Sequence, residues 1–184
     1  MSVLASLFGA VLILVAVWDM FEAVILPRTV SRKFRLSRLF YRSTWWVSRT
    51  VALGLPWRST RVSILSSFGP FSLPLLLGFW AFCLILGFAL VQWGLGPVLG
   101  PPSANVGARM GMGAVLYWSG TTFFTLGYGD IVPHTNLSRI LAVLEAGVGF
   151  GFLAIVISYL PVLYQSFSRR EVGISLLDSR AGSP

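Results

Sequence analysis

Three long apolar stretches constrain the fold of this chain more than any other feature of its sequence. Residues 71–93 carry no charge, residues 140–164 carry only Glu145, and residues 3–26 begin with 16 uncharged residues. A helix needs roughly 20 apolar residues to cross the hydrocarbon core of a bilayer. Charged residues make up 11% of the chain, whereas soluble domains average about 25%. The sequence therefore predicts an all-α membrane protein with three transmembrane helices.

The first apolar stretch has a second interpretation, a cleaved signal peptide. It lacks a basic segment in front of it and a small-residue cleavage motif, and its apolar run is longer than that of a signal peptide. We therefore predict that it is retained as an N-terminal transmembrane helix within residues 1–27.

Basic residues are distributed unevenly between the segments that join these spans. Nine of the 14 lie between Arg28 and Arg61, three follow the last span, and only Arg109 and Arg139 separate the second span from the third. Lys and Arg accumulate on the cytoplasmic side of membrane proteins. We predict a multi-pass protein of the cell membrane with its N-terminus outside and its C-terminus in the cytoplasm. The net charge of +8 then reflects topology and not a nucleic-acid-binding surface.

Arginines recur at helical spacing after the first span. They are Arg28, Arg32, Arg35, Arg38, Arg42 and Arg49. Intervals of three, four and seven place them on one helical face, and the tryptophans at 45, 46 and 57 are of a type enriched at the membrane boundary. The favoured interpretation is an interfacial helix that binds anionic lipid headgroups. The alternative is a voltage sensor, but a sensor must cross the membrane and no apolar frame surrounds these arginines.

One segment is too rich in glycine for a helix and too polar to face lipid. TLGYGD, residues 125–130, follows AVLYWSGTTFF, an apolar run of 11 residues that is too short to span. Non-helical backbone at membrane depth is tolerated where protein buries it or where it lines a water-filled path. Glycines accept positive φ, so that carbonyls can point to one side and replace the hydration shell of a cation. We predict a re-entrant helix followed by a pore-lining loop.

Two spans that flank a re-entrant helix and TLGYGD resemble the pore module of tetrameric potassium channels, over about residues 71–165. In that family the filter binds K+ through backbone carbonyls and a threonine hydroxyl. The matching positions are Thr125, Leu126, Gly127, Tyr128 and Gly129. The resemblance implies K+ ions at residues 125–128 and no organic cofactor. Because one filter strand cannot enclose an ion, it also implies a homotetramer around a central pore.

The resemblance extends to residues that support the filter. Asp130 matches the aspartate of the outer mouth, and Tyr117 and Trp118 fall where the family often has aromatic residues in the pore helix. Phe124 departs from the family, which usually has a second threonine there, and it adds bulk beneath the filter. We expect Leu126, which replaces valine or isoleucine, to preserve selectivity because its carbonyl is unchanged.

Glu145 is the only acid deep in a predicted span apart from Asp19 and Glu22 near the end of the first. An ionised carboxylate there costs roughly 2.5–3.5 kcal/mol, so it should be neutral or hydrogen-bonded. We predict that it supports the filter by bracing the re-entrant helix. Its expected partners are the hydroxyls of Ser119, Thr121 and Thr122. A buried acid with only a packing role is the alternative.

Three glycines, Gly147, Gly149 and Gly151, lie within the last span. Gly149 falls at the hinge glycine of the potassium-channel inner helix, so a gating hinge is one interpretation. Close helix packing through Gly147 and Gly151 is the other. Helix bending also needs a site of low helix propensity, and the sequence leaves both interpretations open.

Three further polar residues admit functional interpretations. Asp19 and Glu22 share a helical face, and we expect them to pair with the arginines that follow, an ion-sensing site being the alternative. His134 has no second His or Cys nearby, which disfavours a metal site. An intramembrane hydrolase that uses Ser119 and His134 is disfavoured too, because no carboxylate is placed to orient the imidazole.

The predicted organisation has four segments. These are the transmembrane helix 1–27, a cytoplasmic basic interfacial segment 28–70, a pore module 71–165 and a cytoplasmic tail 166–184. The predicted function is passive, potassium-selective conduction, and not an enzymatic activity. A non-selective cation channel and a non-conducting membrane scaffold subunit are the alternatives.

Overall fold

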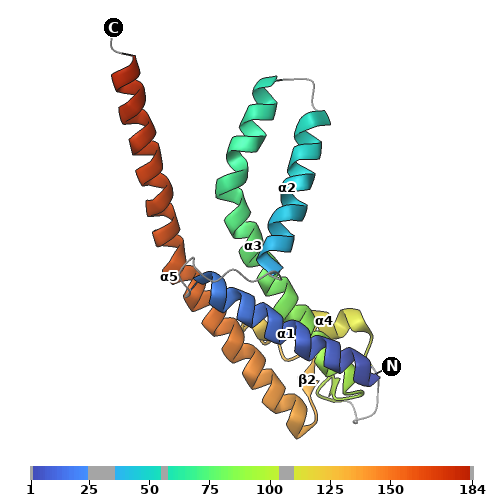
Figure 1. Cartoon of the computed structure of the whole chain (residues 1–184). Helices are drawn as coiled ribbons and strands as arrows, with labels where there is room; N and C mark the ends of the chain where they lie inside the picture. The colour runs from blue at the N-terminus through green and yellow to red at the C-terminus, as the bar shows by residue number, and fades with distance from the viewer. Residues whose placement is uncertain (1, 25–35, 55–57, 104–109, 183–184) are drawn as a thin grey trace.

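The computed structural model describes residues 2–24, 36–54, 58–103 and 110–182, and these form helices joined by loops and one short pair of strands (Figure 1). The helices are α1 Ser2–Val24, α2 Leu36–Gly54, α3 Arg58–Gly94, α4 Met112–Phe123 and α5 Asn136–Ala181. The strands are β1 Leu99–Gly100 and β2 Val132–Pro133. The predicted helical class of the fold is confirmed.

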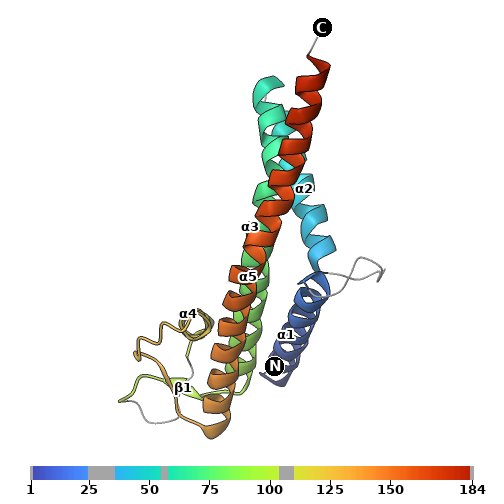
Figure 2. The same ribbon diagram turned by 90° about the vertical axis from the view of Figure 1, so that its left-hand side faces the viewer.

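Three helices in the described part of the chain are long and apolar enough to cross a membrane. Their candidate spans are Val3–Ala23, Phe71–Gly94 and Asn136–Ser158. They coincide closely with the three apolar stretches of the sequence and agree with a membrane protein. The N-terminus lies at the end of these spans that carries the strands, and the C-terminus lies far beyond the opposite end (Figure 2).

Two of these helices are much longer than a bilayer is thick. At 1.5 Å per residue, the 37 residues of α3 and the 46 of α5 reach about 56 and 69 Å, against a hydrocarbon core of about 30 Å. Both helices therefore project beyond the spanning segments (Figures 1 and 2). The sequence did not predict this extension, since the apolar count detects only the part of a helix that lipid surrounds.

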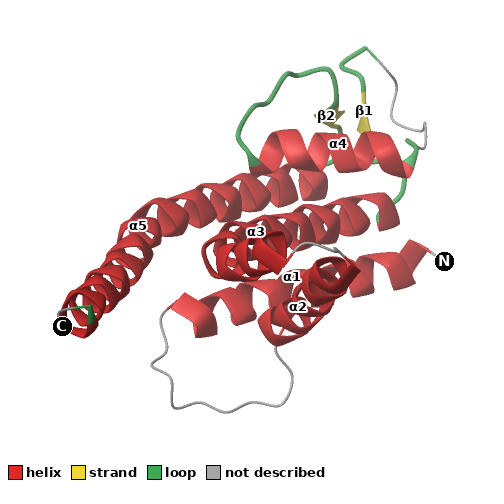
Figure 3. Ribbon diagram, turned by 90° about the horizontal axis from the view of Figure 1, so that it is seen from above, coloured by secondary structure: helices red, strands yellow, loops and turns green. Residues whose placement is uncertain are grey.

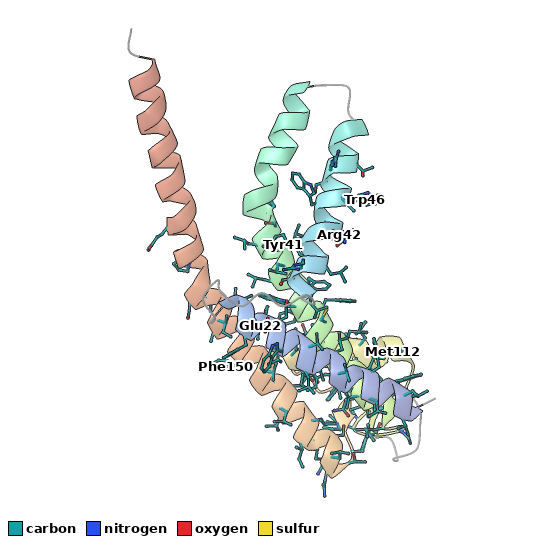
Figure 4. All side chains as sticks on the ribbon, in the orientation of Figure 1. Glu22, Tyr41, Arg42, Trp46, Met112 and Phe150 are labelled. Atoms are coloured by element: carbon teal, nitrogen blue, oxygen red, sulfur yellow. The ribbon has the colours of Figure 1, made fainter. Side chains whose placement is uncertain are left out.

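The helix α2 lies within the basic segment 28–70, whose predicted position at the membrane surface stays a prediction. It runs antiparallel to the projecting part of α3 and away from the spans (Figure 1). Phe40 of α2 packs against Phe79 of α3 with ring centroids 5.2 Å apart, so protein buries this part of α2. Arg42 and Trp46 are exposed (Figure 4). Of the arginines expected to bind lipid, Arg28, Arg32 and Arg35 lie outside the described residues.

The helix α1 packs along α3 through two glycines. A Cβ built at Gly9 would lie 2.5 Å from the Gly87 carbonyl oxygen, so only small residues allow the two backbones this close. Ser6 Oγ also donates a hydrogen bond to the Val91 carbonyl at 3.2 Å. These contacts place α1 on the side of α3 opposite to α4 (Figure 3).

A buried carboxylate joins α1, α2 and α3. Asp19 Oδ2 accepts hydrogen bonds from Ser37 N and Trp80 Nε1, both at 2.9 Å, and Oδ1 accepts from Ser37 Oγ at 3.1 Å. Asp19 thereby caps the first turn of α2, where amides have no partner within the helix. Among the described residues, Ser37 and Trp80 donate hydrogen bonds to Asp19, and the expected pairing with arginine stays a prediction because Arg28, Arg32 and Arg35 lie outside the described residues. Glu22 accepts a hydrogen bond from Trp18 Nε1 at 2.7 Å.

Two connections fix the opposite end of the spans. The strands β1 and β2 pair antiparallel, with Leu99 opposite Pro133, so that the chain after α3 meets the chain before α5. Ser138 Oγ at the start of α5 donates to Gln92 Oε1 of α3 at 2.9 Å, and Gln92 Nε2 donates to the Ser138 carbonyl at 3.2 Å. Both side chains are fully buried. The short helix α4 is held between these anchored elements.

Candidate functional site

The segment after α4 has an alternating backbone conformation. Thr125, Gly127 and Gly129 have φ values of 57°, 54° and 78°, whereas Leu126 and Tyr128 between them do not have positive φ. The prediction that both glycines adopt positive φ is confirmed. Thr125 was not expected in this region, because a β-carbon makes it costly by roughly 1–2 kcal/mol. A non-glycine residue held in such a conformation points to a functional constraint.

The C-terminal turn of α4 holds the beginning of this segment. The Thr121 carbonyl accepts from Leu126 N at 2.8 Å and Gly127 N at 3.4 Å, and the Thr122 carbonyl accepts from Thr125 N at 3.0 Å. The last carbonyls of a helix have no partner within it, and here the amides of the following residues satisfy them. The position of residues 125–127 therefore depends directly on the position of α4.

Packing on both sides determines where α4 lies. Trp118 is buried in a cluster with Val98 and Leu99 of the strand region, and Phe123 is fully buried against Phe152 of α5, with ring centroids 5.7 Å apart. Trp118 thus packs into the interior next to α3 and β1. Phe124, which follows directly, is 44% exposed.

The outer end of the segment is linked back to α4 by a polar contact. Desolvation and the nearby Asp130 carboxylate raise the pKa of the Tyr117 hydroxyl above its usual value. Beyond Asp130, β2 pairs with β1, and His134 N donates to the Val98 carbonyl at 2.9 Å. The segment 125–130 is therefore attached to α4 at one end and to both α4 and the β1 region at the other.

Glu145 contacts the middle of α4 from α5. Ser119 Oγ hydrogen-bonds to Glu145 Oε1 and lies 2.8 Å from the Ile85 carbonyl oxygen of α3. The predicted hydrogen bond between Ser119 and Glu145 is thus confirmed. The Thr121 hydroxyl, a second expected partner, instead donates within α4 to the Trp118 carbonyl at 2.8 Å. The contribution of Ile85 was missed, since a backbone carbonyl has no signature in the sequence.

Gly149 makes the closest approach between α5 and α4. A Cβ built there would lie 1.9 Å from the Phe123 carbonyl oxygen, so no larger residue fits without movement. A Cβ at Gly147 or Gly151 meets nothing within 4 Å in this chain. Within the single chain, close packing therefore occurs at Gly149, which lies between them, and close packing through Gly147 and Gly151 stays a prediction. The hinge interpretation stays a prediction.

Much of the site is open in a single chain. Each of residues 124–130 is exposed, with Leu126 at 56% and Tyr128 at 68%. The adjoining surface of α5 exposes large apolar side chains, among them Val143 and Phe150 (Figure 4). Within the described residues, no group of three or more His, Cys, Asp or Glu side chains could hold a metal ion. Ion-binding groups here would be backbone carbonyls and hydroxyls.

Known proteins match the part of the chain that contains this site. Residues 75–165 match a protein family described as ion channel. Potassium channel subfamily K member 4 of Mus musculus is 31% identical over 71 residues, which cover 39% of this chain and 18% of that protein. The same channel of Rattus norvegicus is 30% identical over 71 residues, with the same coverage of both chains. Protein LctB of Bacillus caldotenax is 32% identical over 85 residues, which cover 43% of this chain and 63% of LctB.

The matched region is less than two thirds of the length of each of these relatives. No solved structure matches the chain.

Proposed function

Through residues 75–165 the chain belongs to a family of potassium channels, which are membrane transport proteins and not enzymes, and we propose that it conducts K+ passively and selectively through TLGYGD. The observation that carries this proposal is the alternation of positive φ at Thr125, Gly127 and Gly129. When residues of positive φ alternate with residues of negative φ along an extended segment, successive peptide planes turn the same way. Their carbonyls then face one side. Such a row of carbonyls can replace the hydration shell of K+.

The partial negative charge at the C-terminal end of α4 favours a cation next to this row of carbonyls. The C-terminal end of a helix carries about half a negative charge, and α4 ends at Phe123, directly before the row of carbonyls. In this proposal K+ binds at the carbonyls of residues 125–128 and at the Thr125 hydroxyl. Trp118, Thr122 and Asp130 act as support for that row.

A homotetramer completes the proposed site. Channels of this family assemble as oligomers, and one exposed strand of carbonyls cannot surround an ion. Only 17% of the most apolar window of the α5 span is buried in the single chain, against 44% for α3. Lipid or another copy of the chain must cover this surface, and the proposed tetramer assigns it to the other copies. Four copies would line the pore with α5 and bring four filter strands together, with α1 at the periphery.

The membrane arrangement of the four segments follows the charge distribution. We place the N-terminus outside, and the projecting α2, the first part of α3 and the C-terminal part of α5 in the cytoplasm. Arg38 and Arg42 are exposed in the first turns of α2, close to the end of the spans. Anionic headgroups of the inner leaflet are their proposed partners, worth about 1 kcal/mol for each basic residue near the surface.

The test is ion flux through the purified protein in proteoliposomes. We expect a reversal potential near that of K+ in opposed K+ and Na+ gradients, passage of Rb+, and block by Ba2+. Gly127→Ala should abolish selective flux, since a β-carbon opposes a φ of 54°. Gly113→Ala in α4 is the matched control, because its Cβ meets nothing within 4 Å and its φ is not positive.

Other results would support a different function. A reversal potential near zero would show a non-selective cation channel. Absence of flux from a folded oligomer in K+, Rb+ and Na+ alike would favour a scaffold subunit. Selective flux in Gly127→Ala would show that the assigned residues do not form the filter.

A further inference from the structure

We propose that Glu145, Ser119 and the Ile85 carbonyl form a hydrogen-bonded relay that holds α4, and with it the filter, between α3 and α5. Ser119 Oγ is within hydrogen-bond distance of both Glu145 Oε1 and the Ile85 carbonyl oxygen. Glu145 and Ser119 are both fully buried. The relay joins three helices at a single hydroxyl. It rests on the proposed function, because its effect is on the conducting filter.

The number of hydrogens determines the direction of each bond. A serine hydroxyl has one hydrogen and can accept further bonds, whereas a backbone carbonyl can only accept. If Ser119 donates to the Ile85 carbonyl, the second contact is a hydrogen bond only if Glu145 donates to Ser119 Oγ. Glu145 is then a neutral carboxylic acid protonated at Oε1.

The opposite arrangement leaves a negative charge in the interior. An ionised Glu145 would take the Ser119 hydrogen and keep a negative charge at full burial, with Oε2 lacking any hydrogen-bond partner among the described residues. A buried charge with a single hydrogen-bond partner is far more costly than a buried neutral acid. The neutral acid is therefore the form that allows both contacts of Ser119 Oγ to be hydrogen bonds.

The relay acts on the filter through the last turn of α4. Ser119 lies two residues before Thr121, whose carbonyl accepts the amide hydrogens of Leu126 and Gly127. Gly149, one turn beyond Glu145 on α5, packs directly against the Phe123 carbonyl. Contact with α5 at two points along α4 fixes both the depth and the tilt of α4. Glu145 is a positioning residue, because it acts on the ion only through α4.

The experiment compares single-channel open durations and oligomer stability in four variants of the full chain and one control variant. Glu145→Gln keeps a donor to Ser119 and should retain the open duration of the parent. Glu145→Leu removes the donor, and we expect open durations to shorten about fivefold, the effect of one net hydrogen bond. Ser119→Ala removes both contacts and should change them more.

The double variant Ser119→Ala/Glu145→Leu distinguishes an effect on the position of α4 from an effect on the stability of the oligomer. Replacing both partners by apolar groups can be nearly neutral for folding, so the oligomer should regain stability while its open durations stay short. Ser138→Ala is the matched control. It breaks another fully buried contact between α3 and α5, with Gln92, but it leaves α4 untouched. We expect it to lower stability without changing open durations.

Infrared spectroscopy tests the protonation state separately. The parent should show the C=O stretching band of a protonated carboxylic acid that Glu145→Gln lacks, and its absence would overturn the assigned donor. Parent-like open durations in both Glu145→Leu and Ser119→Ala, or an equal change in Ser138→Ala, would overturn the positioning role. In those cases the parent still conducts K+ selectively, and only the relay fails. A parent that does not conduct K+ would refute the proposed function as well.

Discussion

A methyl group at Gly149 should disturb the site more than one at either neighbouring glycine. Its Cβ would lie 1.9 Å from the Phe123 carbonyl oxygen and 2.8 Å from the carbonyl carbon, whereas real Cβ contacts below 3.0 Å are essentially never seen. These backbone atoms belong to the last turn of α4, which cannot rotate away as a flexible side chain would. Gly149→Ala must therefore separate α4 and α5 by at least about 1 Å.

The magnitude follows from a comparison within the same helix. Alanine in place of glycine stabilises a helix interior by about 0.5–1 kcal/mol, and this gain applies to Gly147, Gly149 and Gly151 alike. Only Gly149 adds overpacking, at a cost of about 1–3 kcal/mol. The difference between Gly149→Ala and the other two variants isolates the overpacking term.

The assay is thermal unfolding of the detergent-solubilised oligomer, together with K+ flux after reconstitution. We expect Gly149→Ala to unfold at a lower temperature than Gly147→Ala and Gly151→Ala and to lose selective flux. Equal stability and equal flux in all three variants would refute the packing argument. Altered gating in Gly149→Ala without a loss of stability would instead favour the hinge.

Three further outcomes are expected. Asp19→Ala should destabilise the fold by about 1–3 kcal/mol, because it leaves Ser37 N and Trp80 Nε1 buried without an acceptor; an unchanged unfolding temperature would contradict this. Replacing K+ by Na+ should lower oligomer stability, by about 2.7 kcal/mol if K+ was present at 100 times its Kd; equal stability would argue against K+ in the filter. Channel activity should depend on anionic lipid and lose that dependence in Arg38→Gln/Arg42→Gln, which activity measured in neutral and anionic bilayers would check.

The sequence predicted best those features that depend on local chemistry. Membrane spans follow from the absence of charge over a fixed length, and positive φ follows from glycine at residues 127 and 129. The contact between Glu145 and Ser119 was predictable as well, although 26 residues separate the two. A buried acid needs a partner, and few polar side chains were within reach of that face of the last span.

Features that depend on the partner helix could not be predicted in the same way. The described partners of Asp19 lie 18 and 61 residues away, and nothing near Asp19 in the sequence indicates Ser37 or Trp80. Thr125 adopts positive φ because its surroundings hold it there, against its own preference. Among the three glycines of the last span, only the position of Phe123 singles out Gly149.

Acids and glycines add to apolar packing in specifying how these helices are placed. An acid in an apolar span is tolerated where hydrogen bonds reach it, and Asp19 and Glu145 each stand where three helices meet. A glycine allows two backbones to touch, as Gly9 and Gly87 do between α1 and α3 and Gly149 does between α5 and α4. Lipid surrounds apolar side chains equally on any face. The residues that interrupt the apolar pattern therefore act with the packing of Trp118 and Phe123 to give α4 its place behind the filter.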